Sequence, residues 1–216
     1  MSLNTLKIHQ PKKLYFTSDY HFGHSNMIKY DSRPFQDVHD METTIVENHN
    51  SVVPKDAVVI FLGDFMYGNT LKGNDRADKV LELLDCMNGS FFFTFGNHDS
   101  ILLHSKVKQN IKLFDRLTLK VNDSDNLMNQ WCLRNTGREW TSPYQHVVCG
   151  HYRMETWEHS FRGAWMIHGH SHGKIPHSEL QFDAGIMNTK YYPVSYFQLK
   201  KYFTKRFNSL KQKNKE

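Results

Sequence analysis

The chain has 216 residues, of which 39% are hydrophobic and 23% are charged. This composition suits a single globular domain over residues 1–216 and excludes collagen-like and disordered chains. The net charge is only +5, which is compatible with anionic partners, nucleic acid included. No apolar stretch approaches the ~18 residues of a membrane-spanning helix, so we expect no membrane partner.

Buried strands and helices alternate along the first half of the chain. Three apolar runs have the composition of buried strands: residues 13–18, 57–62 and 91–95. Three other segments have helical patterns: residues 25–31, 39–50 and 75–87. Such alternation is typical of a layered α/β fold, in which ligands gather at the carboxyl ends of the strands.

The second half has shorter apolar runs. Four of them are strand candidates: residues 117–121, 131–134, 146–149 and 164–167. Residues 122–130 and 135–145 have the composition of loops. We expect a closing helix over residues 196–203 with Ser195 as its N-cap, followed by a basic tail over about 204–216. A solvated charged end is the ordinary interpretation of that tail, and an arm that binds nucleic acid is the alternative.

The three cysteines, Cys86, Cys132 and Cys149, are widely spaced and form no CxxC pair. An odd, scattered set argues against a disulfide framework and against a thiolate zinc site. We therefore expect free thiols and a reducing compartment, the cytoplasm. Histidine is the unusual residue, with 14 copies.

Many of these histidines fall in short polar clusters that follow apolar runs. Five clusters have this placement: residues 19–21 (Asp-Tyr-His), 63–64 (Gly-Asp), 96–99 (Gly-Asn-His-Asp), 150–151 (Gly-His) and 169–172 (Gly-His-Ser-His). Asp19 and His21 are two residues apart, so an extended backbone would point both to one side. A carboxylate such as Asp64 can bridge two cations, and two cations ~3.5–4 Å apart can clamp a phosphate.

Each cluster alone also has an ordinary structural explanation. Gly-Asp after a strand is commonly a turn, and residues 97–99 could cap a helix. His151 alone would be a satisfied histidine at a strand end. His170 and His172 repel each other when both are protonated, and a shared cation explains them better. Five clusters of N and O donors, each after a strand, together favour a metal site.

The order DxH, GD, GNHD, GH and GHxH resembles the calcineurin-like metallophosphoesterase superfamily, over about residues 13–199. The first motif is extended, as in a compact branch from bacteria and phages: residues 18–26 read SDYHFGHSN and residues 31–35 read DSRPF. The resemblance implies a four-layer αββα sandwich of two mixed β-sheets flanked by helices. It places the site at the strand ends between the sheets.

The resemblance also implies two divalent metal ions as cofactors, with manganese expected first and Ni, Fe, Zn, Co or Mg as alternatives. By position, the ligands are Asp19, His21, Asp64 and His172 for one ion, and Asp64, Asn97, His151 and His170 for the other. His98 matches the catalytic histidine that assists the leaving group, and Asp99 the carboxylate that orients it.

Four further residues are candidate substrate contacts: His24, Asn26, Arg33 and Arg153. For Arg33 the alternative is a loop ion pair with Asp31 or Asp37. For Arg153 the alternative is an ordinary surface cation.

These assignments predict a metal-dependent phosphoesterase, an enzyme whose substrate is a phosphodiester or a nucleotide-like ester. A hydroxide that bridges the two ions would attack phosphorus in line, while His98 donates a proton to the departing alkoxide. One alternative is a metal-dependent nuclease, since the basic tail and the four tryptophans permit contact with nucleic acid. Another is a non-catalytic scaffold with the same fold. Such a scaffold should lack a ligand or His98, and this chain has the full set.

Overall fold

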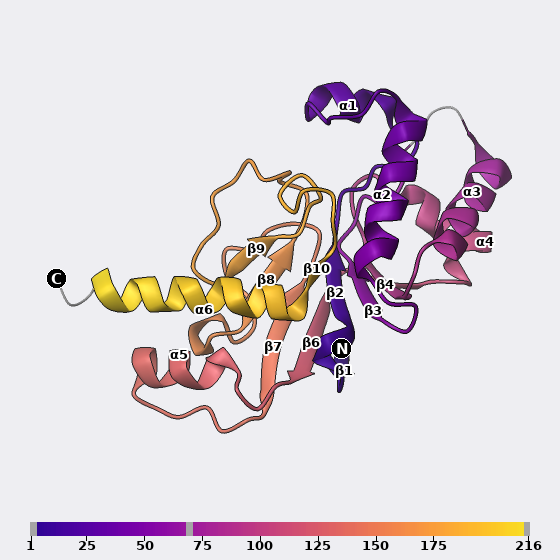
Figure 1. Cartoon of the computed structure of the whole chain (residues 1–216). Coiled ribbons are helices and arrows are strands. Elements are labelled where there is room, and N and C mark those ends of the chain that lie inside the picture. The colour runs from indigo at the N-terminus through magenta and orange to yellow at the C-terminus, as the bar shows by residue number, and fades with distance from the viewer. Residues whose placement is uncertain (1–3, 68–70, 214–216) are drawn as a thin grey trace.

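The structure, a computed structural model, describes residues 4–67 and 71–213. Two five-stranded sheets lie between two groups of helices (Figure 1). This four-layer arrangement is the α/β sandwich of two mixed sheets that the sequence predicts.

The first sheet has the strand order β10-β2-β3-β4-β5. Its strands are β2 (Leu14–Thr17), β3 (Val58–Phe61), β4 (Ser90–Thr94), β5 (Lys112–Phe114) and β10 (Val194–Ser195). The strands from β2 to β5 run parallel, and β10 pairs with β2 antiparallel. Parallel strands end at the same edge of the sheet, so the residues after β2, β3 and β4 come together there.

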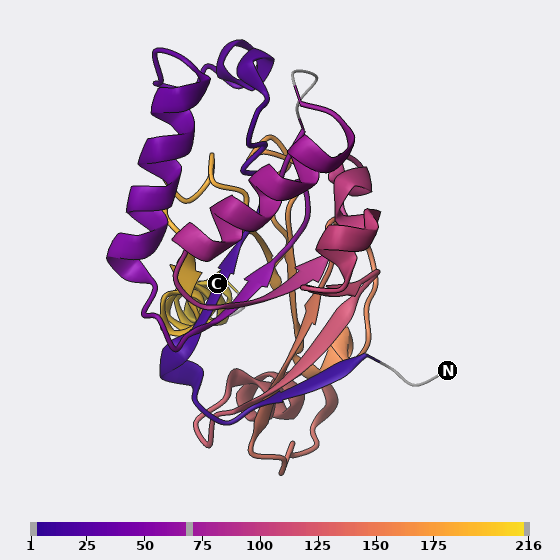
Figure 2. The same cartoon turned by 90° about the vertical axis from the view of Figure 1, so that its right-hand side faces the viewer.

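The second sheet has the order β1-β6-β7-β8-β9. Its strands are β1 (Thr5–Ile8), β6 (Leu117–Asn122), β7 (Tyr144–Cys149), β8 (Trp165–His168) and β9 (Gln181–Asp183). β6 and β7 are antiparallel, whereas the other neighbours are parallel. The N-terminal β1 lies beside β6, indigo and pink in Figure 2, so the chain places β1 in this sheet and β2 in the other.

Six α-helices and three short 3-10 helices connect the described strands. The α-helices are α1 (Ser25–Tyr30), α2 (Val38–Val52), α3 (Gly73–Cys86), α4 (Ser105–Lys108), α5 (Leu127–Thr136) and α6 (Tyr196–Lys213). The 3-10 helices are η1 (Pro11–Lys13), η2 (Asp99–Leu103) and η3 (Ser160–Arg162). α2 begins where the Asp37 side chain accepts the Asp40 N–H at 2.9 Å, an N-cap that ends the preceding loop.

Alternating residues of the strands build two apolar layers. Phe16 and Ile60 of the first sheet pack with Val147 of the second in the core between the sheets. Phe61 and Phe93 point the other way and pack under α2 and α3. Side chains alternate between the two faces of a strand. One set therefore packs the two sheets together, and the other packs the helices on the outer face of the first sheet.

The expectation of a strand over residues 131–134 is wrong, because this stretch belongs to α5. The Asn126 side chain accepts the Met128 N–H at 3.1 Å and caps the helix start. Gly137, with φ of 67°, ends the helix in the left-handed conformation. Residues 122–130, expected as a loop, thus contribute the first turn of this helix. A short apolar run does not distinguish a strand from a helix, and the capping residues decide here.

The expected helix over residues 196–203 is also too short, since α6 runs from Tyr196 to Lys213. Ser195 caps it as predicted: Ser195 Oγ accepts the Gln198 N–H at 3.3 Å, and Gln198 Oε1 accepts the Ser195 N–H at 2.8 Å. Phe207, which lies beyond the expected end, is buried. Residues 204–213, expected as a basic tail, are therefore helical, and residues 214–216 lie outside the described part.

Two further expectations concern the membrane and the thiols. Among the described residues, none of the helices combines the length and the apolar composition that crossing a bilayer requires. Cys86, Cys132 and Cys149 are free thiols, as expected from their spacing.

Candidate metal centre

The predicted ligands lie on five loops that leave the carboxyl ends of strands. The loops after β2, β3, β4, β7 and β8 carry, in chain order, Asp19 with His21, Asp64, Asn97, His151, and His170 with His172. The two sheets meet at this end, where Ser18 pairs with Gly185 in an isolated parallel bridge. The topology therefore gathers all seven residues at one place.

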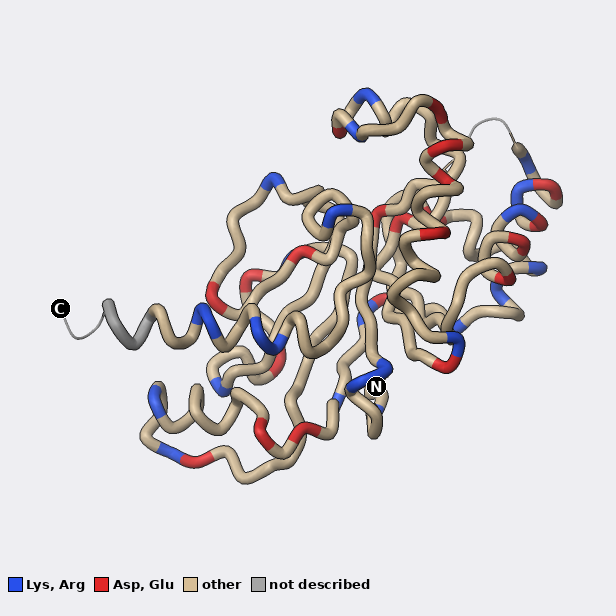
Figure 3. The backbone as a smooth tube through the Cα atoms, in the orientation of Figure 1, with Lys and Arg blue, Asp and Glu red and all other residues tan. Residues whose placement is uncertain are grey.

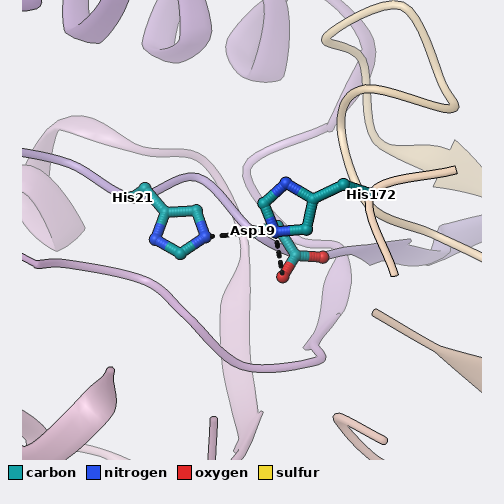
Figure 4. A group of neighbouring side chains, drawn as sticks. All are labelled: Asp19, His21 and His172. Carbon is teal, nitrogen blue, oxygen red and sulfur yellow. Dashed lines mark hydrogen bonds and ion pairs between the residues drawn. The ribbon is translucent and has the colours of Figure 1, made fainter. Parts of the chain in front are cut away.

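Asp19, His21 and His172 form a first cluster, in which one donor atom of each residue lies within 4.8 Å of the others. His21 Nε2 lies 3.4 Å from His172 Nε2, and His172 Nε2 lies 3.6 Å from Asp19 Oδ1. The three side chains face one another in Figure 4. Two imidazole nitrogens and a carboxylate oxygen that converge in this way form a donor set for a divalent cation.

Asp64, His151 and His170 form a second cluster, again with donor atoms within 4.8 Å of one another. Asn97 adjoins it, with Oδ1 3.1 Å from His151 Nε2. Asp64 Oδ2 lies 3.4 Å from His151 Nε2 and 3.6 Å from His21 Nε2. Asp64 thus lies between the two clusters, as a carboxylate that bridges two cations must.

The backbone at these positions is strained. Five of the seven residues have positive φ: Asp19 (60°), His21 (55°), Asp64 (58°), His170 (65°) and His172 (49°). Residues with a Cβ rarely adopt this region, and each instance costs on the order of 1–3 kcal/mol. Hydrogen bonds from the backbone N–H hold four of them. Asp19 donates to the Gly63 carbonyl and His21 to the Asp64 carbonyl, while Asp64 donates to the Asp99 carboxylate and His170 to the Asp19 carboxylate. Strain concentrated in this way is typical of a functional site.

Glycines let the loops approach each other closely. A Cβ on Gly96 would lie 2.3 Å from Asp64 Oδ1, and a Cβ on Gly169 would lie 2.0 Å from Ser18 Oγ. Neither contact is sterically possible. A glycine directly before Asn97 and another directly before His170 are therefore required for the two clusters to form.

Neighbouring groups determine which nitrogen of two histidines faces the clusters. His151 Nδ1 lies 2.7 Å from the Leu62 carbonyl, so Nδ1 carries the proton and Nε2 is the free donor atom. His172 Nδ1 contacts Asp31 Oδ2, which leaves His172 Nε2 toward Asp19. Metal-ligating histidines commonly have such a carbonyl or carboxylate partner on the second nitrogen. Sequence reasoning missed this role of Asp31, although its place in the extended first motif was a signal.

Two buried carboxylates hold the ligand loops from behind. Asp99 accepts the N–H groups of Asp64 (2.8 Å), Phe65 (2.8 Å) and Gly96 (2.9 Å). Asp99 was expected to orient His98, but its hydrogen bonds described here go to these main-chain amides, so it fixes the loops of Asp64 and Asn97 instead. Asp183 acts in the same way on the loop that carries His170 and His172.

Asp183 accepts from Ser171 Oγ at 2.7 Å and from the Gly173 N–H at 2.8 Å. Its other oxygen accepts the Gly185 N–H at 2.8 Å. Asp183 thereby ties the end of β9 to the loop that carries His170 and His172. The sequence offered no motif that singles this residue out.

Burial and mutual charge shift the titration of the clusters. Burial raises the pKa of Asp19 to about 7 and lowers that of His21 to about 2. Burial also acts to raise the pKa of Asp64, but His151 outweighs it and lowers that pKa to about 2. A cation bound beside the buried carboxylates of Asp19 and Asp64 would favour their ionised form. The lowered pKa of His21 keeps its imidazole neutral, with a lone pair to donate to a cation. The donor set of carboxylate, imidazole and amide therefore fits divalent cations.

His98 borders the clusters. Its backbone N–H donates to Asp64 Oδ1 at 2.8 Å, and its ring centroid lies 5.3 Å from that of His21. A donor atom of His98 also lies within 4.8 Å of those of His21 and Asp64. A cavity of about 290 Å³ is lined by His98 together with most of the predicted ligands. His98 can therefore reach a group bound in that cavity.

The substrate candidates separate into two pairs. His24 and Asn26 line a second cavity of about 510 Å³, which also has His98 in its wall. Arg33, in contrast, is only 4% exposed and donates to the carbonyls of Tyr20 (2.9 Å) and Asp19 (3.0 Å).

Arg33 also lies 3.5 Å from Asp31 in an ion pair, the alternative that the sequence left open. The Arg33 guanidinium is thus bonded within the protein, where it supports the loop of Asp19. Arg153 is exposed and donates to the Pro176 carbonyl at 3.1 Å. It lines neither of the two cavities.

Comparisons with known proteins agree with this geometry. A family profile described as calcineurin-like phosphoesterase matches residues 12–196. An uncharacterized protein of Methanocaldococcus jannaschii is 43% identical over 88 residues, which are 41% of this chain and 47% of that protein. The chain thus spans about half the length of this relative. A crystal structure of a protein of unknown function from Aquifex aeolicus is similar in fold, with a TM-score of 0.57 and 19% identity over 87% of this chain and 97% of that one.

Proposed function

The chain belongs to the calcineurin-like phosphoesterase family, and we propose that it hydrolyses a phosphate ester with two divalent metal ions. The observation that carries this proposal is the position of Asp64, whose Oδ2 lies 3.6 Å from His21 Nε2 and 3.4 Å from His151 Nε2. A carboxylate shared by two donor clusters is what a dinuclear centre requires.

Two sets of residues would hold the ions. One set is Asp19, His21, Asp64 and His172, and the other is Asp64, Asn97, His151 and His170. When bound, a pair of divalent cations neutralises charge on the phosphate oxygens and lowers the pKa of water. Manganese is the ion that we propose first, and Ni, Fe, Zn, Co and Mg also suit these nitrogen and oxygen donors.

His98 is proposed as the general acid that donates a proton to the departing alkoxide. It lines the cavity formed by the ligand clusters, and its backbone is held by the bond to Asp64. Asp99 holds the loop on which His98 lies through the Gly96 amide. A positioned acid of this kind contributes roughly 10²–10⁴-fold to the rate.

The substrate that we propose is a phosphodiester or a nucleotide-like ester, and three free cysteines suit a reducing compartment such as the cytoplasm. A nuclease would draw on basic α6, which carries lysines and an arginine without acidic residues (Figure 3). Part of that charge is used internally, because Lys200 pairs with Asp123 and Arg206 donates to the His177 carbonyl. We therefore rank the nuclease second. The scaffold is not favoured, because the ligand set and His98 lie together.

The test measures hydrolysis by protein from which a chelator has removed the metal ions and to which a single divalent metal is then added. A panel of phosphomonoesters, phosphodiesters, cyclic nucleotides and short oligonucleotides is assayed with Mn²⁺, Ni²⁺, Co²⁺, Zn²⁺ or Mg²⁺. We expect chelation to abolish hydrolysis and Mn²⁺, Ni²⁺ or Co²⁺ to restore it, because the donors are nitrogen and oxygen. Full activity in exhaustively metal-free protein would contradict the proposal.

A further inference from the structure

Two cavities meet at His98. The smaller, of about 290 Å³, contains the ligand clusters, and the larger, of about 510 Å³, lies on the side of α1. His98, Met27 and Tyr30 line both. Volumes of ~300–1,000 Å³ are typical of ligand sites, so the larger cavity is of sufficient size for a substrate moiety of its own.

A continuous series of rings leads from the metal ligands into the larger cavity. The His98 ring lies 5.3 Å from that of His21 and 4.5 Å from that of Tyr67. The Tyr67 ring lies 4.6 Å from that of His24, which lies 6.2 Å from that of Tyr30. A ligand in this cavity would therefore contact aromatic rings at several points.

The cavity has polar groups but no formal charge among its described lining residues, apart from the titratable histidines. Asn26 contributes an amide, and Tyr30 and Tyr67 contribute hydroxyl groups. Such a wall does not compensate a second phosphate or a carboxylate. It suits an uncharged planar heterocycle with hydrogen-bonding edges, because every base can stack on an aromatic ring.

We propose that this cavity, lined by His24, Asn26, Tyr30 and Tyr67, binds the leaving group of the substrate and that this group is a nucleoside. The inference rests on the proposed function, because it takes His98 as the acid. The group that receives a proton from His98 must lie against it. The larger cavity also has His98 in its wall, and the rest of that group extends into it.

The experiment compares two substrates that have the same ester bond. Adenosine 5′-monophosphate and ribose 5-phosphate are both cleaved at a primary alkoxide, and they differ in the base. The measured quantity is the ratio of their kcat/KM values. We expect the wild-type protein to favour the nucleotide by roughly 10-fold or more, the usual contribution of base stacking.

Variants assign this preference to the cavity. Tyr67→Leu and Tyr30→Leu should each lower the ratio by roughly 5- to 100-fold, whereas Tyr67→Phe keeps the ring and should largely preserve it. Tyr192→Leu is the matched control, since Tyr192 is an exposed tyrosine outside this cavity, and should leave the ratio unchanged. The ratio cancels any disturbance of His98, because both substrates need its proton.

Binding of adenosine itself separates this inference from the proposed function. Saturation-transfer NMR with adenosine and with ribose needs no hydrolysis, and we expect contact with adenosine that Tyr67→Leu weakens. If adenosine binds in this way while no ester is hydrolysed, the proposed activity falls and the nucleoside site stands. If esters are hydrolysed but the ratio is near one, or is equal in Tyr67→Leu and wild type, the inference is overturned.

Discussion

At the scale of single residues, Asn97 and His98 are neighbours with different surroundings. Asn97 Oδ1 lies 3.1 Å from His151 Nε2 within the second cluster, whereas His98 lines the cavities beside it. We therefore propose the first residue as a metal ligand and the second as a substrate contact.

His98→Ala tests the acid role. We expect the variant to keep its metal and its phosphate binding, but to lose roughly 10²–10⁴-fold in rate on alkyl or nucleoside phosphate esters. The loss on a nitrophenyl ester should be clearly smaller, because nitrophenolate leaves without a proton. Steady-state kinetics on both ester types, with metal content measured in parallel, provide the comparison.

Equal losses on both ester types with metals retained would reject the acid role and leave His98 as a group that stabilises charge in the transition state. Loss of a metal ion in the variant would instead make His98 a ligand. The position of His98 would permit that role, since one of its donor atoms lies within 4.8 Å of those of His21 and Asp64. Such a result would contradict the ligand assignment.

Asp31 holds His172 from behind, and its removal should weaken metal binding without removing a ligand. For Asp31→Asn we expect a loss of roughly 10- to 100-fold in the affinity of one of the two ions, the usual effect of such a partner. Competition with a metal-sensitive dye measures it. Asp115→Asn, at an exposed position, is the matched control. Equal affinities in the two variants would mean that Asp31 serves only its ion pairs with Arg33 and Lys174.

At the scale of elements, the loops are held by buried carboxylates and the helices by their caps. From the loops that carry ligand candidates, Asp99 accepts three N–H groups and Asp183 accepts a hydroxyl and an N–H group. α6 is held at its start by Ser195 and along its length by buried aromatic residues. The rigid elements therefore fix the strained ligand positions, and the strain is offset by packing elsewhere.

Phe203→Ala tests whether α6 is packed against the second sheet. Phe203 is 1% exposed, and its ring stacks on that of Trp165 at 4.6 Å. Its truncation should lower the free energy of unfolding by about 3–5 kcal/mol, because it leaves a cavity against the second sheet. Phe197→Ala, on the same helix but 43% exposed, should cost far less. Denaturant unfolding measures both, and equal costs would indicate that this face of α6 is not packed against the sheet.

At the scale of the whole molecule, the site exists because two sheets end at the same place. β2, β3 and β4 of one sheet and β7 and β8 of the other each deliver ligands there. The buried strands β2, β3, β4, β7 and β8 and the polar clusters after them were predictable, because an apolar run and a motif are local properties. Their meeting point followed from the family resemblance.

Other features could not be predicted because they depend on contacts distant in sequence. The strands β5, β9 and β10 have two or three residues, too few for a period to emerge. Arg33 was a candidate for the substrate side, but the carbonyls that it binds become neighbours only in the folded loop. The same holds for Asp31 and His172, which are 141 residues apart. Local pattern therefore identifies ligands better than the residues that position them.

The most direct test of the central claim is the metal content of Asp64→Asn beside that of the wild type. Inductively coupled plasma mass spectrometry on desalted, Mn²⁺-loaded protein should give two ions per wild-type chain. Asp64→Asn should fall well below two and lose hydrolysis, because both clusters share this carboxylate, whereas His172→Ala should mainly lose one ion. Two ions per chain in a folded Asp64→Asn protein would contradict the bridged dinuclear centre.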